Sequence, residues 1–218
     1  AAAFPPPRPR GARAPPPRRG LSPDPPPATA LFHERGFDAT SLSDIAVRLG
    51  ITKAGLYRHV TSRAELLRAV TGPVRAEVQA LLAANPAGAG RPLDGLTGLL
   101  RGLAGAVAAD PERHAVFWGV HGVPSRDPLD HACRASLVRG LEDLLERAVA
   151  RGDVRDDIAP RLAARLLVGA VVGAVVGAVT GPVTGPDGLR DAAGPPMSPR
   201  AVDVLLDGPV RSLTGGRS

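Results

Sequence analysis

The chain has 218 residues, enough for one ordinary domain or for a small domain joined to a medium one. Hydrophobic residues make up 44% but aromatic residues only 3%, so a core must be built from Leu, Val and Ala, which favours packed helices over strands. Cys133 is the single cysteine, which excludes an intrachain disulfide and a cysteine-rich zinc site. The N-terminus lacks the apolar stretch of a signal peptide, so we expect a cytoplasmic protein. From the aliphatic composition we expect its fold to be all-α.

The formal net charge of +6 is concentrated towards the N-terminus. Residues 1–27 carry five arginines and one aspartate, a balance of +4, and residues 28–71 carry six basic and four acidic residues, a balance of +2. Such a concentration favours a polyanionic partner, because Lys and Arg displace counterions from phosphates. The alternative is a solvated basic surface without a partner.

Residues 1–27 are expected to form a disordered or polyproline-like arm. They contain eleven prolines, in part as three runs of three, interleaved with arginines. Each proline removes a backbone donor and fixes φ, which excludes a helix or a central strand. Because the arm begins without a Met, our hypothesis is that it reflects a misplaced start or frame in a GC-rich gene.

Four short helices are predicted between residues 28 and 70. The first ends at Gly36. Ser41 and Asp44 form a capping box that opens the second helix at residue 42, and Gly50 follows where a left-handed residue is needed to end it. Thr52 caps the third helix. A second capping box at residues 62–65 opens the fourth.

The spacing between residues 42 and 60 predicts a helix-turn-helix unit. Two helices that cross over a short turn need a small residue at the crossing, a glycine in the turn and apolar residues that hold the second helix down. Ala46 and Gly50 fill the first two places, and the apolar set is Ile45, Leu49, Ile51 and Leu56. The outward side of the second helix, suited to contact base edges and phosphates, would carry Thr52, Lys53, Ala54, Tyr57, Arg58 and His59. In the alternative, the unit serves packing only, and Tyr57 and His59 are partly buried.

Three segments resemble the DNA-binding domain of TetR/AcrR-type regulators. They are LFHERGFDATSLSDIA (31–46), GITKAGLYRHV (50–60) and SRAELL (62–67). Several motifs in the right order make this far more specific than a lone motif. The resemblance implies a homodimeric all-helical protein, usually a repressor, whose C-terminal domain binds a small molecule and thereby releases double-stranded operator DNA.

The resemblance also implies roles for individual residues. Residues 52–59 would form the recognition helix, in which Lys53, Ala54 and Gly55 lie close to the bases and Tyr57 and His59 at phosphates.

At the start of the preceding helix, the resemblance implies that Thr40 and Ser41 hold a phosphate, because exposed N–H groups and the helix dipole favour an anion there. Arg63 stands where the family usually has a lysine beside the DNA backbone, so the charge is kept but the contact geometry changes.

The sequence departs from the family pattern at three places. Prolines at 23 and 25–27 forbid an early start of the first helix, and Val60 replaces the usual phenylalanine after the recognition helix. Pro73 is expected to interrupt or restart the fourth helix, which in relatives links the ligand pocket to the DNA-binding head. We therefore divide the chain into an arm (1–27), a DNA-binding domain (28–72) and a helical ligand-binding and dimerisation domain (73–218).

In that last domain, helices are predicted near 92–109, 111–121, 128–151, 159–180 and 199–213. Helical spacing puts four side chains on one side of a helix, where they could line a ligand pocket or belong to the core: His114, Phe117, Trp118 and His121. Together with His114 and His121, His131 and Cys133 could be considered as metal ligands. No acidic or cysteine pair accompanies them at the usual spacing, so no metal or other cofactor is expected.

Residues 166–186 carry no charge and include glycines at every fourth place, among them Gly169, Gly173 and Gly177. A glycine stripe lets two helices approach closely, so we expect a dimer interface; a membrane-spanning helix is the alternative. Cys133 and His131 lie two residues apart without any catalytic motif, so we expect no enzymatic activity.

Overall fold

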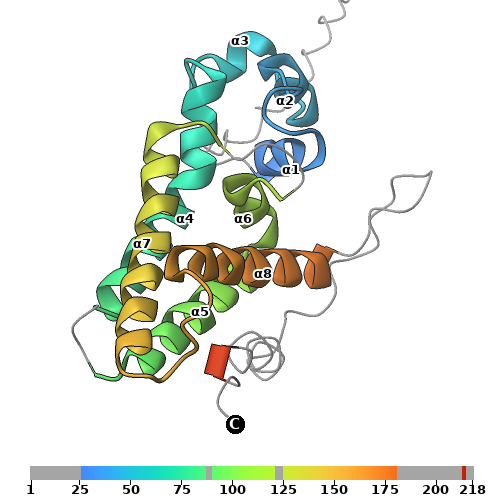
Figure 1. Ribbon diagram of the computed structural model, residues 1–218. Helices are drawn as coiled ribbons and strands as arrows, with labels where there is room; N and C mark the ends of the chain where they lie inside the picture. The colour runs from blue at the N-terminus through green and yellow to red at the C-terminus, as the bar shows by residue number, and fades with distance from the viewer. Residues whose placement is uncertain (1–25, 87–89, 121–124, 181–212, 215–218) are drawn as a thin grey trace, which may run out of the picture.

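The computed structural model describes residues 26–86, 90–120, 125–180 and 213–214, and these residues form helices and connections without a strand (Figure 1). The all-α prediction is confirmed. The helices are α1 (Pro26–Arg35), α2 (Leu42–Arg48), α3 (Lys53–Leu56), α4 (Arg63–Ala84), α5 (Pro92–Ala109), α6 (Pro111–Trp118), α7 (Pro128–Ala150) and α8 (Pro160–Thr180).

Proline marks the start of most of the longer helices. Pro92, Pro111, Pro128 and Pro160 are the first residues of α5, α6, α7 and α8. This position suits proline, because the first N–H groups of a helix have no partner inside the helix and φ is already set near the helical value. These local signals explain why the starts of these helices agree with the predicted ones to within one residue.

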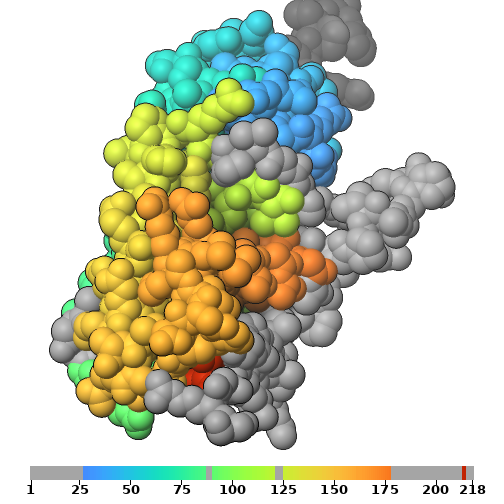
Figure 2. Space-filling view, in the orientation of Figure 1, coloured from blue at the N-terminus to red at the C-terminus, as the bar shows by residue number. Residues whose placement is uncertain are grey.

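Two hydrophobic cores divide the molecule into a head and a body. The head consists of α1, α2, α3 and the first half of α4, and its buried residues include Phe32, Ile45 and Leu56. The body consists of the second half of α4 together with α5, α6, α7 and α8. Figure 2 shows the head, in blue and cyan, as a lobe at one end of the molecule.

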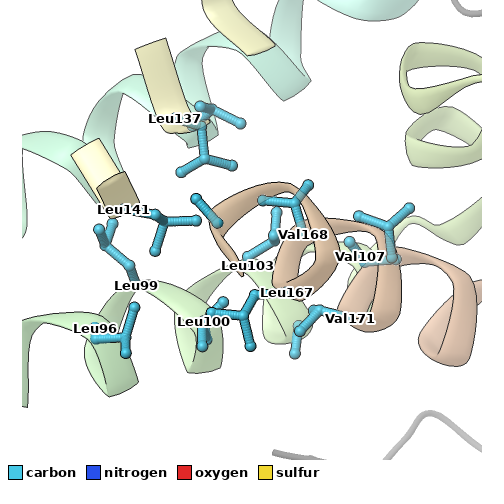
Figure 3. Close-up of a cluster of buried hydrophobic side chains, with 14 of the residues drawn as sticks. Leu96, Leu99, Leu100, Leu103, Val107, Leu137, Leu141, Leu167, Val168 and Val171 are labelled. Carbon is cyan, nitrogen blue, oxygen red and sulfur yellow. The ribbon is translucent and has the colours of Figure 1, made fainter. Parts of the chain in front are cut away.

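The body core is built where α8 packs against α5 and α7. Figure 3 shows Leu103 from α5, Leu141 from α7 and Val168 from α8 converging on one another. All three are buried, and apart from Phe117 and Cys133 the buried residues of the cluster are Leu, Val and Ala. A core of this kind fits the low aromatic content, because aliphatic side chains interdigitate well between helices.

Helix α6 lies between the head and the body. Val116 packs against the head core, whereas its neighbour Phe117 is fully buried in the body core. Arg134 of α7 holds the C-terminal end of α6 through a 2.7 Å hydrogen bond from Nη1 to the Phe117 carbonyl. A movement of α6 would therefore change the packing of both cores.

Several helix boundaries differ from the predicted ones. The first helix begins at Pro26 rather than at residue 28, since proline is tolerated in the first turn. The recognition helix is shorter than expected, because α3 ends at Leu56 and residues 57–59 form a turn. Pro73 does not interrupt α4, which runs from Arg63 to Ala84. The boundary expected at 72/73 thus falls inside one helix. The arm up to residue 25 and the helix expected at 199–213, except Leu213, lie outside the described residues.

Candidate nucleic-acid interface

The first helix of the helix-turn-helix unit is fixed by the predicted capping box. The Ser41 hydroxyl accepts a 3.1 Å hydrogen bond from the Asp44 N–H, and the Asp44 carboxylate accepts one of 2.9 Å from the Ser41 N–H. These bonds satisfy N–H groups that a helix start would leave without a partner. The Ser41 hydroxyl also donates a 2.6 Å hydrogen bond to the Asp44 carboxylate, and this bond, followed by the one from the Ser41 N–H, lowers the pKa of Asp44. A negative charge therefore stands beside Ser41, which opposes the phosphate contact expected there.

Gly50 turns the chain between α2 and α3. Its φ is +65°, in the left-handed region that side chains disfavour. The next residue, Ile51, donates a 3.0 Å hydrogen bond back to the Ala46 carbonyl and closes the turn. The chain then enters α3 with Thr52 as its cap, whose hydroxyl accepts a 3.1 Å bond from Gly55. Local sequence thus sets the crossing of the two helices.

Helix α3 presents its predicted outer side to solvent at the tip of the head (Figure 1). Leu56 is 2% exposed and anchors the helix in the head core. Gly55 is half-buried close to Thr52. The exposed residues are Thr52, Lys53, Ala54, Tyr57, Arg58 and His59. Tyr57 is 46% exposed and His59 is exposed as well, so both side chains can reach a partner, and their contact with phosphates stays a prediction.

Two cations on this surface are available for an anionic partner. Within the described part of the chain, neither Lys53 nor Arg58 forms an ion pair. The Lys53 Nζ lies 5.9 Å from the centroid of the Tyr57 ring, so the ring orients the ammonium group without neutralising it. An exposed, uncompensated charge of this kind suits contact with phosphates and base edges.

Thr40 has a different role from the expected one. It is 0% exposed, and its hydroxyl donates to the Gly36 carbonyl at 2.8 Å and to the Leu31 carbonyl at 3.3 Å. Its N–H donates to the Phe37 carbonyl at 3.3 Å, so neither the N–H nor the hydroxyl of Thr40 is directed at a phosphate in this geometry. Thr40 instead ties the end of α1 to the start of α2.

Arg63 also makes contacts within the head. Its Nη1 donates 3.0 Å bonds to the carbonyls of Asp38 and Thr40, and its guanidinium lies 4.2 Å from the Phe37 ring. The side chain therefore braces the connection between α1 and α2, and the contact with the DNA backbone expected for Arg63 stays a prediction. Sequence reasoning missed this role because the carbonyls lie more than twenty residues away.

Comparisons with known proteins agree with this geometry. Residues 27–70 match the family model "Bacterial regulatory proteins, tetR family". A gamma-butyrolactone receptor described as ArpA-like is 30% identical, with 67% of this chain and 75% of that chain covered and a TM-score of 0.54. The chain belongs to the TetR family. It is a DNA-binding transcriptional regulator.

Other solved structures share the fold along most of the chain. A member of the family from Streptomyces coelicolor A3 is 27% identical, covers 88% of this chain and 89% of its own, and gives a TM-score of 0.67. AibR, solved with isovaleryl coenzyme A and operator DNA, is 22% identical, with coverages of 86% and 94% and a TM-score of 0.61. No curated protein matches the chain.

In this TetR-family regulator, the side chains expected to line a pocket contact the protein itself. His114 is fully buried, and its Nε2 lies 3.0 Å from Oε2 of Glu77 on α4. The Trp118 indole N–H donates to His114 Nδ1 at 3.4 Å, so the neutral ring carries its proton on Nε2 and donates to Glu77. Burial lowers the pKa of His114, although Glu77 opposes this effect.

Ligand lining by His114, Phe117 and Trp118 stays a prediction, and His121 lies outside the described residues. No group of three or more His, Cys, Asp or Glu side chains that could hold a metal occurs among the described residues.

The glycines expected at a dimer interface lie on the exposed side of α8. Gly169, Gly173 and Gly177 are exposed, and a Cβ added at any of them would meet nothing within 4 Å. The same helix is the one described segment that is long and apolar enough to span a membrane, over Pro160–Gly177. The share of that window buried inside the protein is 44%, because the valines on its other side enter the body core.

Proposed function

We propose that the protein is a cytoplasmic, dimeric repressor that binds a palindromic operator through α3 and is released by a small molecule. The observation that carries this proposal is the exposed surface of α3 and the turn after it, where Lys53 and Arg58 have no ion pair within the described chain while Leu56 anchors the helix in the head core. Ala54 and the half-buried Gly55 would approach the bases, and Tyr57 and His59 would contact phosphates. The protein thus acts by binding rather than by catalysis.

A second copy of the chain would cover the exposed stripe of α8. Small residues on this stripe let the helices approach closely, and Leu162 and Leu166, 53% and 59% exposed, extend it with apolar surface. Two-fold symmetry would then present two α3 helices to successive major grooves, which requires half-sites about one helical turn apart.

The proposed release is a population shift. An effector that favours one arrangement of the body changes DNA affinity only if the head follows. Helix α6 supplies a route, because Val116 packs in the head core and Phe117 in the body core. That one relative is a gamma-butyrolactone receptor supports a small-molecule effector for this protein as well.

Selection of genomic DNA fragments with the purified full chain tests this function. We expect enrichment of a small set of fragments that share a palindrome. Gamma-butyrolactones are then added to the bound complex as the first effector probes, and release of the fragment is measured. Absence of any enriched fragment would contradict operator binding, whereas enrichment without release would exclude these lactones as the effector.

A further inference from the structure

Helix α4 changes from one core to the other near its middle. Leu67 and Val70 are buried in the head core, whereas Val74 and Val78 are buried in the body core. The change occurs within one turn that contains Gly72 and Pro73. This turn is therefore the place where a bend of α4 would reorient the head relative to the body.

The same turn is the weakest part of the helix. Pro73 has no N–H, so the carbonyl of Ala69 four residues earlier cannot receive the usual helical hydrogen bond. Gly72 adds backbone freedom without a side chain to restrict it. Sharp helix bends occur mostly at prolines and other such interruptions. The backbone alone therefore holds α4 less firmly at this turn than elsewhere.

Two ion pairs from the start of α7 bridge this turn. Before Pro73, the Arg68 Nε lies 2.6 Å from the Asp127 carboxylate. After it, Arg75 Nη1 bonds to the carboxylate of Asp130, which is fully buried. Arg75 Nη1 also donates to the Thr71 hydroxyl at 2.9 Å, so the guanidinium itself reaches back across the turn.

Helix α7 is a firm support for both carboxylates. Asp127 caps the helix, since its other oxygen accepts a 2.9 Å bond from the Leu129 N–H, and its side chain is only 6% exposed. Asp130 follows in the first turn of α7. The two acceptors therefore cannot move independently of each other.

Beyond Pro73, α4 is fixed to the body at close range. A Cβ added to Gly102 of α5 would lie 2.3 Å from the Leu81 side chain, which shows how closely the two helices approach. Glu77 adds the polar contact to His114 of α6. The body half of α4 is thus packed closely against α5 and bonded to α6, and the head half has its ionic contact with α7 through Arg68.

We propose that the pairs Arg68–Asp127 and Arg75–Asp130 form an ionic splint that holds α4 across Gly72 and Pro73 and so sets the orientation of the DNA-binding head. The effect of the splint on operator affinity rests on the proposed function, whereas the existence of the splint does not. Displacement of the first turn of α7 would open the splint and release the head.

Hydrogen exchange of backbone amides in the free protein tests the splint. Arg68→Ala removes a charge-assisted hydrogen bond, so amides of residues 70–72 and 74–77 should exchange roughly tenfold faster, while those of α5 are unchanged. Asp127→Asn, which keeps an N-cap, should act in the same direction. Arg151→Ala, which removes the remote pair with Asp153, is the matched control and should leave α4 unchanged.

A second change makes the test specific to the proline. Pro73→Ala restores an N–H and a normal helical turn. In this background, Arg68→Ala should increase the exchange rate of the same α4 amides by less than about threefold relative to Pro73→Ala alone. Unchanged exchange in Arg68→Ala, an equal increase throughout the protein, or no rescue by Pro73→Ala would overturn the splint.

With a selected operator fragment, Arg68→Ala should weaken binding several-fold, and Pro73→Ala should restore it. Altered exchange with unchanged operator affinity would overturn the role of the splint in orienting the head. Because exchange is measured without DNA, a failure to find any operator would count against the proposed function and not against the splint.

Discussion

His114 of α6 and Glu77 of α4 form a 3.0 Å contact between the helix that bridges the two cores and the helix that leads to the head. The imidazole is fully buried, whereas the Glu77 side chain is 46% exposed. Burial keeps the ring neutral, with its Nε2 proton directed at the carboxylate. Protonation of this histidine therefore opposes the folded arrangement.

The stability of the protein should consequently fall as the pH drops below about 6.5. Burial lowers the pKa of His114 in the folded state. As the pH falls, the unfolded chain therefore binds a proton at a higher pH than the folded chain does, and this proton binding stabilises the unfolded state relative to the folded one. Between the folded pKa and 6.5 the loss is at most about 1.4 kcal/mol per pH unit. Tm measured from pH 8 to pH 5 should decrease less steeply in His114→Gln than in the wild type.

His131→Gln serves as the control, because His131 is exposed on α7. It should keep the wild-type slope. Parallel curves for wild type and His114→Gln would show that His114 does not titrate in this way.

Arg63 should matter for the stability of the head more than for DNA contact. Arg63→Ala removes two hydrogen bonds to backbone carbonyls and the stacking on Phe37, so we expect a loss of about 1 to 3 kcal/mol in the free energy of unfolding. Urea denaturation measures the change. Arg48→Ala, which breaks only the exposed pair with Glu34, should cost less than about 1 kcal/mol. Equal effects of the two changes would contradict the bracing role.

Local signals account for what the sequence predicted well. The capping serine at 41, the left-handed glycine at 50 and the prolines that begin α5, α6 and α7 each act within a few residues of their own position. Such short-range chemistry is visible without a fold. The helix order and the exposed side of α3 follow from it.

The roles that sequence did not predict depend on partners far along the chain. Arg75 bonds to Asp130, 55 residues away, and His114 to Glu77, 37 residues away. The inward turn of Thr40 likewise depends on a carbonyl of α1. Which charged side chains meet is decided by the packing of helices, and no spacing rule along one helix encodes it. The continuity of α4 through Pro73 follows from the same long-range contacts.

Gly50 should tolerate asparagine better than alanine. Nothing lies within 4 Å of a Cβ added there, so the cost comes from the left-handed φ of +65° alone. We expect Gly50→Ala to destabilise the protein by about 1 to 2 kcal/mol and Gly50→Asn by less, since asparagine visits this region readily. Thermal denaturation followed by circular dichroism compares the two. A larger loss for Asn than for Ala would indicate that the turn is limited by space rather than by φ.

The exposed stripe of α8 should prove to be the dimer interface. Gly173→Glu places a carboxylate from each protomer near the two-fold axis, and repulsion and desolvation should weaken dimerisation by about 3 kcal/mol, roughly a hundredfold in Kd. Light scattering at a series of concentrations measures this change. Gly105→Glu, on the exposed side of α5 with open space around it, should leave the dimer intact. A dimer that survives Gly173→Glu unchanged would place the interface elsewhere.

Operator affinity of variants on α3 and the turn after it tests the central claim most directly. Lys53→Ala should weaken binding by about 1 to 3 kcal/mol, and Arg58→Ala should weaken it similarly while lowering the salt dependence, because one phosphate contact is lost. Arg139→Ala, an equal loss of charge on the exposed side of α7, is the control and should bind as the wild type does. Fluorescence anisotropy with a selected fragment gives the affinities. If Lys53→Ala and Arg58→Ala both bind with wild-type affinity, α3 is not the surface that contacts DNA.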